Sequence, residues 1–350
     1  MNTTTSTPTI VSTPEAGHKR GCLFWLKRGL LGLVILLIAL PVTGMLYEAV
    51  MAAGDTARYP APGSLISVND HKLHIHCVGE GSPTVVLESG FGSTSLDWLF
   101  VQPQVAEFTR ICAYDRAGMG WSETSSSSRD PQHIAANLHT LLANAGIEPP
   151  YVLVGHSLGG KDIRLFAIQY PQDVAGMVFV DARHESIEPV RTPEQYAKDT
   201  EAYESSFGIY STLRTLGVAR LLGAALQPLV NPATQVFSPE IRTQMTLLGT
   251  QGKTLDAMKA ESAAGMANDD QLRAATLGDL PIVVLAAGTS IEAESRWLSA
   301  QEALAGLSTN SRLTIVDGAG HNIHWDHPAE VTQAVQVVVE AVRAGQSLAE

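Results

Sequence analysis

The chain beyond residue 63 alternates between two hydrophobic patterns. Short runs, either alternating or continuously apolar, have the pattern of strands. The predicted strands are residues 71–78, 84–90, 110–115, 151–155, 176–181, 281–288 and 312–318. Longer runs between them have the helical pattern, at residues 96–108, 133–145, 158–170, 293–304 and 328–344. Strands that alternate with helices predict an α/β protein with a mostly parallel sheet covered on both faces.

The alternation stops between residues 183 and 277, where no convincing strand pattern occurs. Helical patterns fill this segment at residues 192–206, 210–226 and 240–248. A helical block inserted into an α/β sheet is most simply a cap over one end of that sheet. The sequence therefore predicts one core domain, of residues 64–182 and 278–350, and a helical cap of residues 183–277.

The first 63 residues follow neither pattern. Residues 1–28 are rich in Thr, Ser and Pro, become basic toward their end, and predict a disordered tail. Residues 29–47 form an uncharged apolar run that nearly reaches across a hydrocarbon layer of ~30 Å. This predicts a transmembrane anchor, followed by a linker at residues 48–63.

The charges beside the apolar run predict its orientation. Lys19, Arg20, Lys27 and Arg28 precede it, and the positive-inside rule then places the tail in the cytoplasm and the folded domain outside. A cleavable signal peptide is the alternative, because the small residues near position 53 fit a cleavage site. The mature protein would then be secreted.

Composition excludes some function classes. Among 350 residues, 45% are hydrophobic and 17% are charged, which suits a large folded core. The net charge of −12 repels phosphate backbones, so no nucleic-acid partner is expected. Three cysteines form neither a disulfide framework nor a zinc site. Cys77 and Cys112 are interpreted as small buried thiols.

A group of histidines in the first predicted strand is a candidate metal site. His74 and His76 lie on one face of residues 71–78, and His71 begins the strand. No acidic residue or cysteine accompanies them on that face. A solvated strand face is therefore the interpretation, and no metal is expected.

The strongest chemical signal is the GHSLG motif around Ser157, between a predicted strand and a predicted helix. A serine hydroxyl is a weak nucleophile and must be held clear of the sheet beside a base. A sharp strand-to-helix turn does this, and Gly155 and Gly159 prevent side-chain collisions there. The backbone N–H of Leu158 would point at the reacting carbonyl oxygen. The motif predicts a nucleophilic serine.

A phosphate-binding loop overlaps the same motif. Gly155, Gly160 and Lys161 fit G-x-x-x-x-G-K, also between a strand and a helix. The next residue is Asp162, where such a loop needs Ser or Thr for magnesium. A carboxylate there would repel phosphate, so the nucleotide interpretation is rejected.

A base and an acid should complete the site. His321 follows the last strand between glycines that free its loop, which makes it the predicted base, with His324 as the local alternative. The acid that orients the imidazole is ambiguous. Asp181 ends the strand after the nucleophile's helix and is favoured, while Glu292 and Glu294 follow the next strand.

The oxyanion that forms on the substrate needs backbone donors. One predicted donor is Leu158, and the second is the N–H of Phe91, in the glycine-containing loop at residues 89–92. The alternative is that these glycines only turn the chain.

Taken together, residues 64–344 resemble the α/β-hydrolase superfamily. The likeness is carried by GHSLGG at the nucleophile, ESGFGS at residues 88–93, DRAGMGWS at residues 115–122 and GAGHNIHWDHP at residues 318–328. The resemblance implies an eight-stranded sheet with its second strand antiparallel, a helical lid after the sixth strand, and no cofactor. The chain departs from the usual pattern by lacking an aspartate after the seventh strand. Members with the acid after the sixth strand are known, which admits Asp181.

The predicted function is a serine hydrolase that cleaves a carboxylic ester of an apolar small molecule through an acyl-enzyme. Because the nucleophile is serine, the resemblance disfavours epoxide hydrolase and dehalogenase chemistry. The alternatives are an amidase, acyltransferase, C–C hydrolase or perhydrolase, or a non-catalytic, membrane-tethered binding module. The apolar substrate is suggested by leucines that could equally form the cap's own core, namely Leu213, Leu216, Leu221, Leu222 and Leu226.

Overall fold

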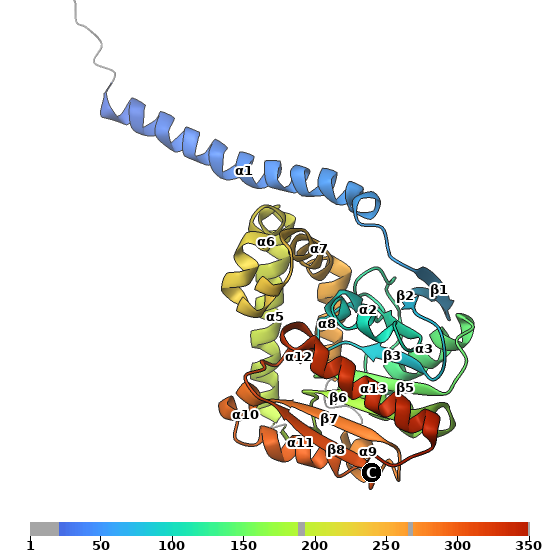
Figure 1. Ribbon diagram of the computed structural model, residues 1–350. Helices are drawn as coiled ribbons and strands as arrows, with labels where there is room; N and C mark the ends of the chain where they lie inside the picture. The colour runs from blue at the N-terminus through green and yellow to red at the C-terminus, as the bar shows by residue number, and fades with distance from the viewer. Residues whose placement is uncertain (1–20, 188–192, 265–268, 349–350) are drawn as a thin grey trace, which may run out of the picture.

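An eight-stranded sheet in the order β1-β2-β4-β3-β5-β6-β7-β8 forms the centre of the protein (Figure 1). The computed structural model describes residues 21–187, 193–264 and 269–348. The strands are β1 (Ser64–Val68), β2 (His71–Val78), β3 (Thr84–Glu88), β4 (Ile111–Tyr114), β5 (Tyr151–His156), β6 (Val174–Val180), β7 (Ile282–Ala287) and β8 (Ser311–Val316). Strand β2 runs antiparallel to β1 and β4, and the other neighbours are parallel. The predicted fold class is confirmed.

Helices cover both faces of the sheet and bury two separate hydrophobic cores. On β3, Val86 faces one core, while Val85 and Leu87 face the other, because successive strand residues point to opposite faces. The first core contains residues of α3 (Pro131–Asn144), α4 (Gly159–Gln169) and α11 (Trp297–Ala305). The second contains residues of η1 (Ser95–Trp98), α2 (Gln102–Val105), α12 (Ile323–Asp326) and α13 (Pro328–Ala344).

One predicted helix differs from the structure. Residues 96–108 were expected to form one helix but form the short helices η1 and α2, joined by a turn. Pro103 explains where α2 begins, because its ring suits the first turn of a helix and no interior position. The short helices η2 (Pro171–Asp173), η3 (Glu185–Ile187) and α10 (Gly288–Ala293) complete the core.

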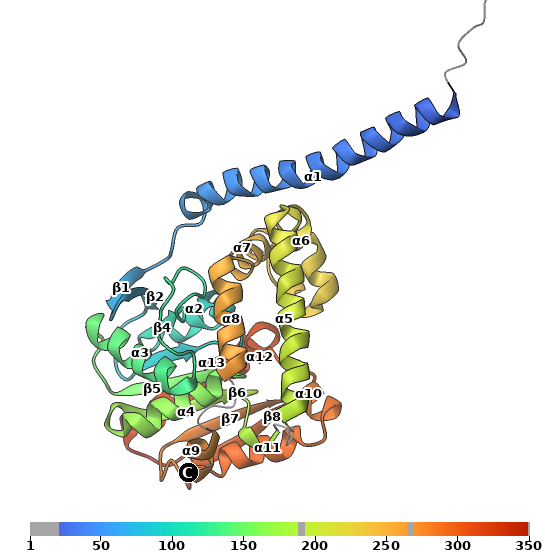
Figure 2. The same cartoon turned by 180° about the vertical axis from the view of Figure 1, so that it is seen from behind.

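The segment between β6 and β7 is helical, and we call its helices α5–α9 the cap. They are α5 (Pro193–Thr215), α6 (Val218–Val230), α7 (Pro239–Gly249), α8 (Gly252–Ala264) and α9 (Asp269–Ala274), with η4 (Pro232–Val236) between α6 and α7. Figures 1 and 2 show α5 and α8 standing beside the sheet, with α6 and α7 at their far ends. Leu213, Leu221 and Leu222 are exposed, so they do not form a core of the cap. The side chain of Leu226 lies outside the described residues.

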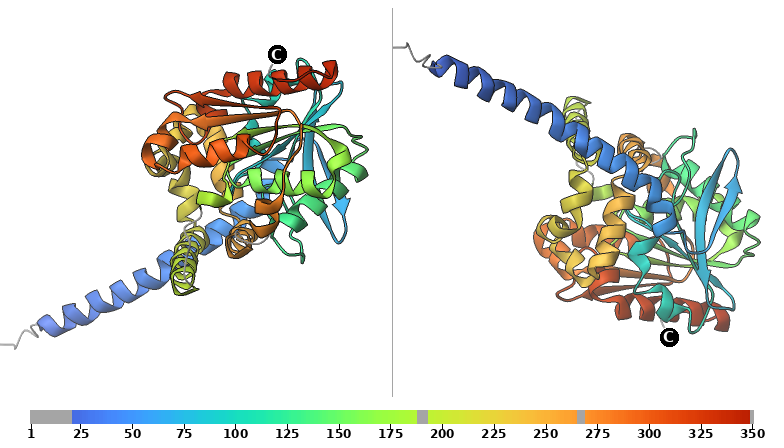
Figure 3. Two further views of the ribbon diagram at one scale, coloured as in Figure 1. Left: turned by 90° about the horizontal axis from the view of Figure 1, so that it is seen from below. Right: turned by 90° about the horizontal axis from the view of Figure 1, so that it is seen from above.

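The first part of the N-terminal helix α1 (Cys22–Arg58) extends away from the rest of the protein (Figure 3). Its segment Leu23–Asp55 is long enough and apolar enough to cross a membrane. The tail predicted at residues 1–28 lies outside the described residues up to residue 20, and its last part is helical from Cys22 on. The linker predicted at residues 48–63 is also helical as far as Arg58, because no proline or glycine pair stops the helix at Glu48.

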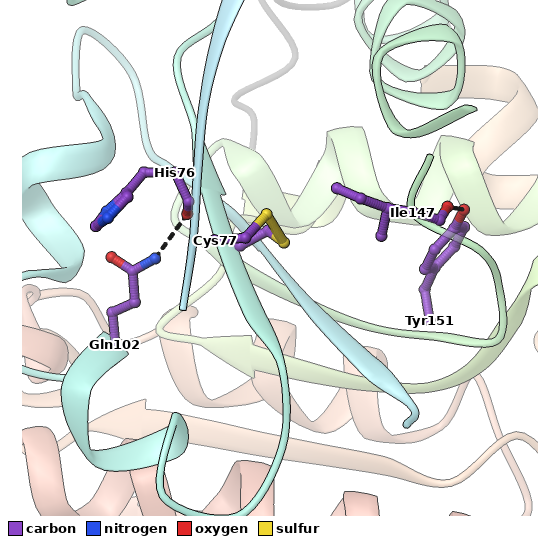
Figure 4. Close-up of a disulfide and its surroundings, with 6 residues drawn as sticks. His76, Cys77, Gln102, Ile147 and Tyr151 are labelled. Atoms are coloured by element: carbon purple, nitrogen blue, oxygen red, sulfur yellow. Dashed lines mark hydrogen bonds between the residues drawn. A yellow bond between two sulfur atoms is a disulfide. The ribbon is translucent and has the colours of Figure 1, made fainter. Parts of the chain in front are cut away.

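The interpretation of two cysteines as buried thiols is wrong. Cys77 and Cys112 form a disulfide across β2 and β4 (Figure 4). The two strands are antiparallel neighbours, and their register places Cys77 directly opposite Cys112. The spacing of 35 residues in the sequence gave no sign of this pairing, because β3 lies between the two strands in the chain but beside only one of them in the sheet.

The interpretation of the histidine face of β2 as solvated is also wrong. His71 and His74 are buried. The Nδ1 atom of His74 lies 2.8 Å from a carboxylate oxygen of Asp115, and its Nε2 contacts the carbonyl of Pro62. The turn after β4 therefore covers this face of β2. In the described residues no group of three or more His, Cys, Asp or Glu side chains is arranged to hold a metal ion.

Candidate active site

Ser157 lies at the turn between β5 and α4 in a strained backbone conformation. Its φ angle is +51°, a left-handed value that residues with a side chain seldom adopt. A Cβ atom on Gly155 would lie 2.8 Å from the carbonyl oxygen of Gly159, and one on Gly159 would lie 2.7 Å from that of Glu88. Both glycines are therefore required by close backbone contacts. The turn lifts the Ser157 hydroxyl away from the sheet.

Three predicted residues are joined in one chain of hydrogen bonds. The Ser157 Oγ atom lies 2.9 Å from His321 Nε2, and His321 Nδ1 lies 2.7 Å from Asp181 Oδ2. Asp181 is completely buried, whereas the side chain of His321 is 42% exposed. A substrate can therefore reach the Ser–His pair, while the carboxylate is kept from water.

Asp181 is held by donors from β7 and the segment after it. Its Oδ1 atom accepts hydrogen bonds from the Ala287 backbone N–H at 2.8 Å and from the Trp297 indole at 2.7 Å. Its Oδ2 atom accepts one from the Ser290 hydroxyl at 2.8 Å as well as the contact with His321. These hydrogen bonds fix the carboxylate in one orientation toward His321.

The two alternative acids lie elsewhere. Glu292 is exposed, and Glu294 accepts hydrogen bonds from the backbone and guanidinium of Arg296. The helix α10, which directly follows β7, contributes Ser290 as a donor to Asp181. Nothing in the sequence indicated Ser290 or Trp297. Both act by holding Asp181, which lies more than a hundred positions earlier in the chain.

Three histidine rings form a row beside Ser157. The ring of His156 lies between those of His321 and His324, with centroids 4.7 and 4.3 Å away. His324 also packs on Trp98, at 4.6 Å. Burial, followed by the nearby charge of His321, lowers the pKa of His324 to about 3. A neutral ring held against Trp98 does not suit the local alternative in which His324 is the base.

His156 was not singled out by sequence reasoning, although it precedes the nucleophile. Its Nε2 atom lies 3.0 Å from the backbone carbonyl of His321, so it fixes the loop that carries this residue. Burial, with the charges of His324 and His321, holds the pKa of His156 well below its usual range. His156 is therefore a neutral support for the His321 loop.

The loop after β3 lies against the nucleophile. A Cβ atom on Gly90 would lie 3.2 Å from the Ser157 Cβ and 2.9 Å from His156 Nδ1, so only glycine fits there. Phe91 follows Gly90, and Leu158 is the N-cap residue directly before the helix α4. The N–H groups at the start of a helix have no partner within it. The two predicted oxyanion donors thus belong to adjacent backbone segments.

Arg116 holds this loop from behind. Its guanidinium donates to the carbonyls of Ser89 at 2.6 Å and Gly90 at 2.8 Å, and it pairs with Glu88 and Glu261. Burial alone would lower the pKa of Arg116, but the two carboxylates raise it well above its ordinary value. Because Glu261 belongs to α8, Arg116 connects the loop to the cap.

The residues of the rejected phosphate-loop motif are engaged in the fold. The ammonium group of Lys161 is buried, 2.8 Å from a carboxylate oxygen of Asp269 in α9. Asp162 is also buried, and burial, with the charge of Glu88, raises its pKa well above the ordinary value. Lys161 therefore pairs with the cap and does not extend toward a bound phosphate.

The fold and the Ser–His–Asp geometry together define a class of protein. Its members have an α/β sheet that carries a serine at a sharp turn between a strand and a helix. A family model described as the alpha/beta hydrolase family matches residues 85–334. The chain therefore belongs to the alpha/beta hydrolase family.

Two relatives cover most of the chain. An uncharacterized protein of Schizosaccharomyces pombe is 29% identical over 78% of this chain and 55% of its own length. The uncharacterized protein YqjL of Bacillus subtilis is 27% identical over 74% of this chain and 85% of its own length. The chain thus spans about half of the first relative and most of the second.

Solved structures show the same fold. An esterase from Thermogutta terrifontis superposes with a TM-score of 0.60 at 20% identity, covering 80% of this chain and 98% of that one. The epoxide hydrolase CorEH superposes with a TM-score of 0.62, also at 20% identity, over 79% and 98% of the two chains. At this identity the likeness concerns the fold alone.

Proposed function

We propose that this protein is a serine hydrolase that cleaves carboxylic esters of apolar small molecules. The observation that carries the proposal is the hydrogen-bonded chain from Ser157 through His321 to the buried Asp181. A binding module would need neither a strained serine nor an imidazole with an oriented tautomer. The serine at this position also argues against the chemistry of the epoxide hydrolase that shares the fold.

The geometry supports acyl transfer to water in two steps. His321 Nε2 removes the Ser157 proton as Oγ attacks the ester carbonyl, and the same proton then passes to the departing alcohol. Water, deprotonated by His321, hydrolyses the resulting acyl-enzyme and frees the serine. Asp181 holds the proton on Nδ1 and stabilises the imidazolium in both steps.

The oxyanion of each step would be bound by the N–H groups of Phe91 and Leu158. Arg116 supports this arrangement because it fixes the carbonyls of Ser89 and Gly90, directly before Phe91. A rigid loop needs no reorganisation during the reaction. The side chain of Met258 in α8 closes over Gly92 of the same loop. An apolar side chain there favours an apolar acyl group.

Covalent labelling separates an enzyme from a binding module. We expect the full chain to react with a fluorophosphonate probe, and the Ser157→Ala variant to remain unlabelled. A folded wild-type protein that does not react would overturn the proposal. Rates with p-nitrophenyl esters of increasing acyl length, compared with the corresponding anilides, then distinguish an esterase from an amidase.

The acid is tested with matched carboxylate variants. Asp181→Asn should reduce kcat by roughly 10³–10⁴-fold, because the amide favours the wrong imidazole tautomer. Glu292→Gln and Glu294→Gln should leave kcat unchanged, since neither side chain contacts His321. A large loss in a glutamate variant, with Asp181→Asn active, would assign the acid to the loop after β7.

We also propose that α1 is retained as a membrane anchor with the folded domain outside the cytoplasm. Two observations support this: the basic residues before the apolar run, and the disulfide between Cys77 and Cys112. Disulfides persist mainly in oxidising compartments. The intact-protein mass decides between an anchor and a cleaved signal peptide. Before reduction, a thiol-reactive polymer should label Cys22 alone.

A further inference from the structure

The cap helix α6 carries an apolar face with no partner among the described residues. The side chains of Leu221, Leu222 and Leu229 are 63%, 49% and 79% exposed, and Ala225 is exposed between them. Their spacing in the sequence places them on one side of the helix. We call these four residues the α6 apolar face. Exposed leucines in such a group mark an interaction surface.

The end of α6 that begins this face lies against α1. A Cβ atom on Gly44 would overlap the carbonyl oxygen of Leu216, and one on Gly217 would lie 3.0 Å from the Tyr47 ring. The corner between α5 and α6 therefore contacts α1 directly, and Figures 1 and 2 both show it beside this helix. Gly44 and Tyr47 belong to the last turn of the uncharged run at residues 29–47.

Ion pairs also hold α6 of the cap against α1. Arg220 in α6 binds Glu48 through contacts of 2.8 and 3.0 Å and Asp55 through two contacts of 2.7 Å. Both carboxylates follow the apolar run, so they lie on the outer side of the proposed span. Arg220 faces α1 from the side of α6 opposite to the leucines. The leucines thus lie on the side of α6 away from these contacts, and the first residues of this helix meet the last turn of the apolar run.

We infer that the α6 apolar face inserts into the outer leaflet of the membrane that α1 crosses. A helix with one apolar side at the depth of Gly44–Tyr47 meets the boundary between headgroups and acyl chains, where amphipathic helices bind. The inference rests on the proposed anchor. It adds that the cap is seated on lipid, so that an apolar ester enters from the bilayer.

Depth-dependent quenching of fluorescence tests whether the α6 apolar face lies in the membrane. In the full-length Cys22→Ser protein, a single labelling cysteine is placed by Leu222→Cys, Ile38→Cys or Glu302→Cys and coupled to an environment-sensitive dye. The proteins are reconstituted in phosphatidylcholine–phosphatidylglycerol vesicles with spin-labelled phosphatidylcholine. We expect strong quenching at positions 38 and 222, with a shallower depth at 222, and none at the exposed position 302 on α11.

The three labelled positions distinguish failure of the inference about α6 from failure of the proposed anchor. Quenching at position 38 without quenching at 222 would overturn the inference and leave the anchor intact. A second protein copy covering the leucines would give that same result. Absence of quenching at position 38 would contradict the proposal that α1 is a membrane anchor. Fluorescence at position 302 controls for non-specific contact of the core with lipid.

Kinetics with two substrates provides an independent readout. Leu221→Glu should raise the apparent KM for a long-chain ester embedded in vesicles about tenfold, from the loss of one lipid-buried leucine. The same variant should hydrolyse a short, water-soluble ester at the wild-type rate. The matched control Ser205→Glu, an exposed position in α5, should change neither value. An unchanged KM for the embedded ester in Leu221→Glu would contradict the inference.

Discussion

Ion pairs attach the cap both to the core and to α1, and one attachment of each kind shows how their surroundings differ. At the core, Glu261 of α8 binds Arg116 and Arg129, and all three side chains are buried. At the anchor, Arg220 of α6 binds Glu48 and Asp55, whose side chains remain 10% and 17% exposed. Asp55 is thus more exposed to water than any side chain of the first attachment.

The two attachments also differ in their distance from the proposed active site. The core attachment includes the carbonyls of Ser89 and Gly90 through Arg116, and α8 packs over the loop through Met258. Any displacement of α8 therefore disturbs the proposed oxyanion site. The anchor attachment touches only α1 and the corner between α5 and α6. Its expected role is to orient the cap relative to the membrane.

The largest effect is expected from Glu261→Gln. The substitution leaves Arg129 and part of Arg116 buried without a counter-charge, which costs about 3–5 kcal/mol of unfolding free energy. Urea unfolding of the full chain in detergent micelles measures this loss. The fraction that stays folded should also show a reduced kcat, because the loop carrying Phe91 loses its support.

The control for this prediction is Asp270→Asn. Asp270 pairs with Arg273 at 2.8 Å but its side chain is fully exposed, so its removal should change the unfolding free energy very little. Equal losses in the two variants would mean that burial does not distinguish the core attachment from a surface ion pair.

An effect of intermediate size is expected at Asp97, which should make the free energy of unfolding depend on pH. Burial raises the pKa of Asp97 to about 7 from an ordinary value of 3.8. Between these pH values the unfolded chain binds fewer protons than the folded one, so stability falls as pH rises through the window. The contribution of this residue has a slope of at most about 1.4 kcal/mol per pH unit.

Asp97→Asn should remove that slope and make the protein more stable than wild type above pH 7. Unfolding free energies measured from pH 4 to pH 8 test this, with Asp279→Asn at an exposed position as the control. A wild-type slope that persists in Asp97→Asn would assign the pH dependence to another group.

The sequence predicted the parts of the molecule that depend on neighbouring residues. The strand–turn–helix around Ser157 follows from Gly155 and Gly159, which make local backbone contacts, and the alternation of strands and helices predicted the sheet. The position of His321 followed from the glycines of its own loop.

Features that join distant segments were not predictable. The sequence left Asp181 and the two glutamates as alternatives, because the choice depends on which strand end faces His321. Arg116 and Glu261 are separated by 145 positions, and the pairing of Cys77 with Cys112 depends on the order of β2 and β4 in the sheet. Burial of His74 depends on the turn that covers it.

The smallest effect is expected at the anchor attachment, from Arg220→Met. Methionine keeps the aliphatic bulk and removes the charge, so Glu48 and Asp55 lose their shared partner at a site that water can reach. Ion pairs near a surface contribute about 1 kcal/mol and weaken in salt. The variant should therefore unfold like wild type at high ionic strength, be slightly less stable at low ionic strength, and hydrolyse a soluble ester normally. A loss of kcat as large as that of Glu261→Gln would show instead that the anchor attachment also controls the active site, and the separation of the two attachments would fail.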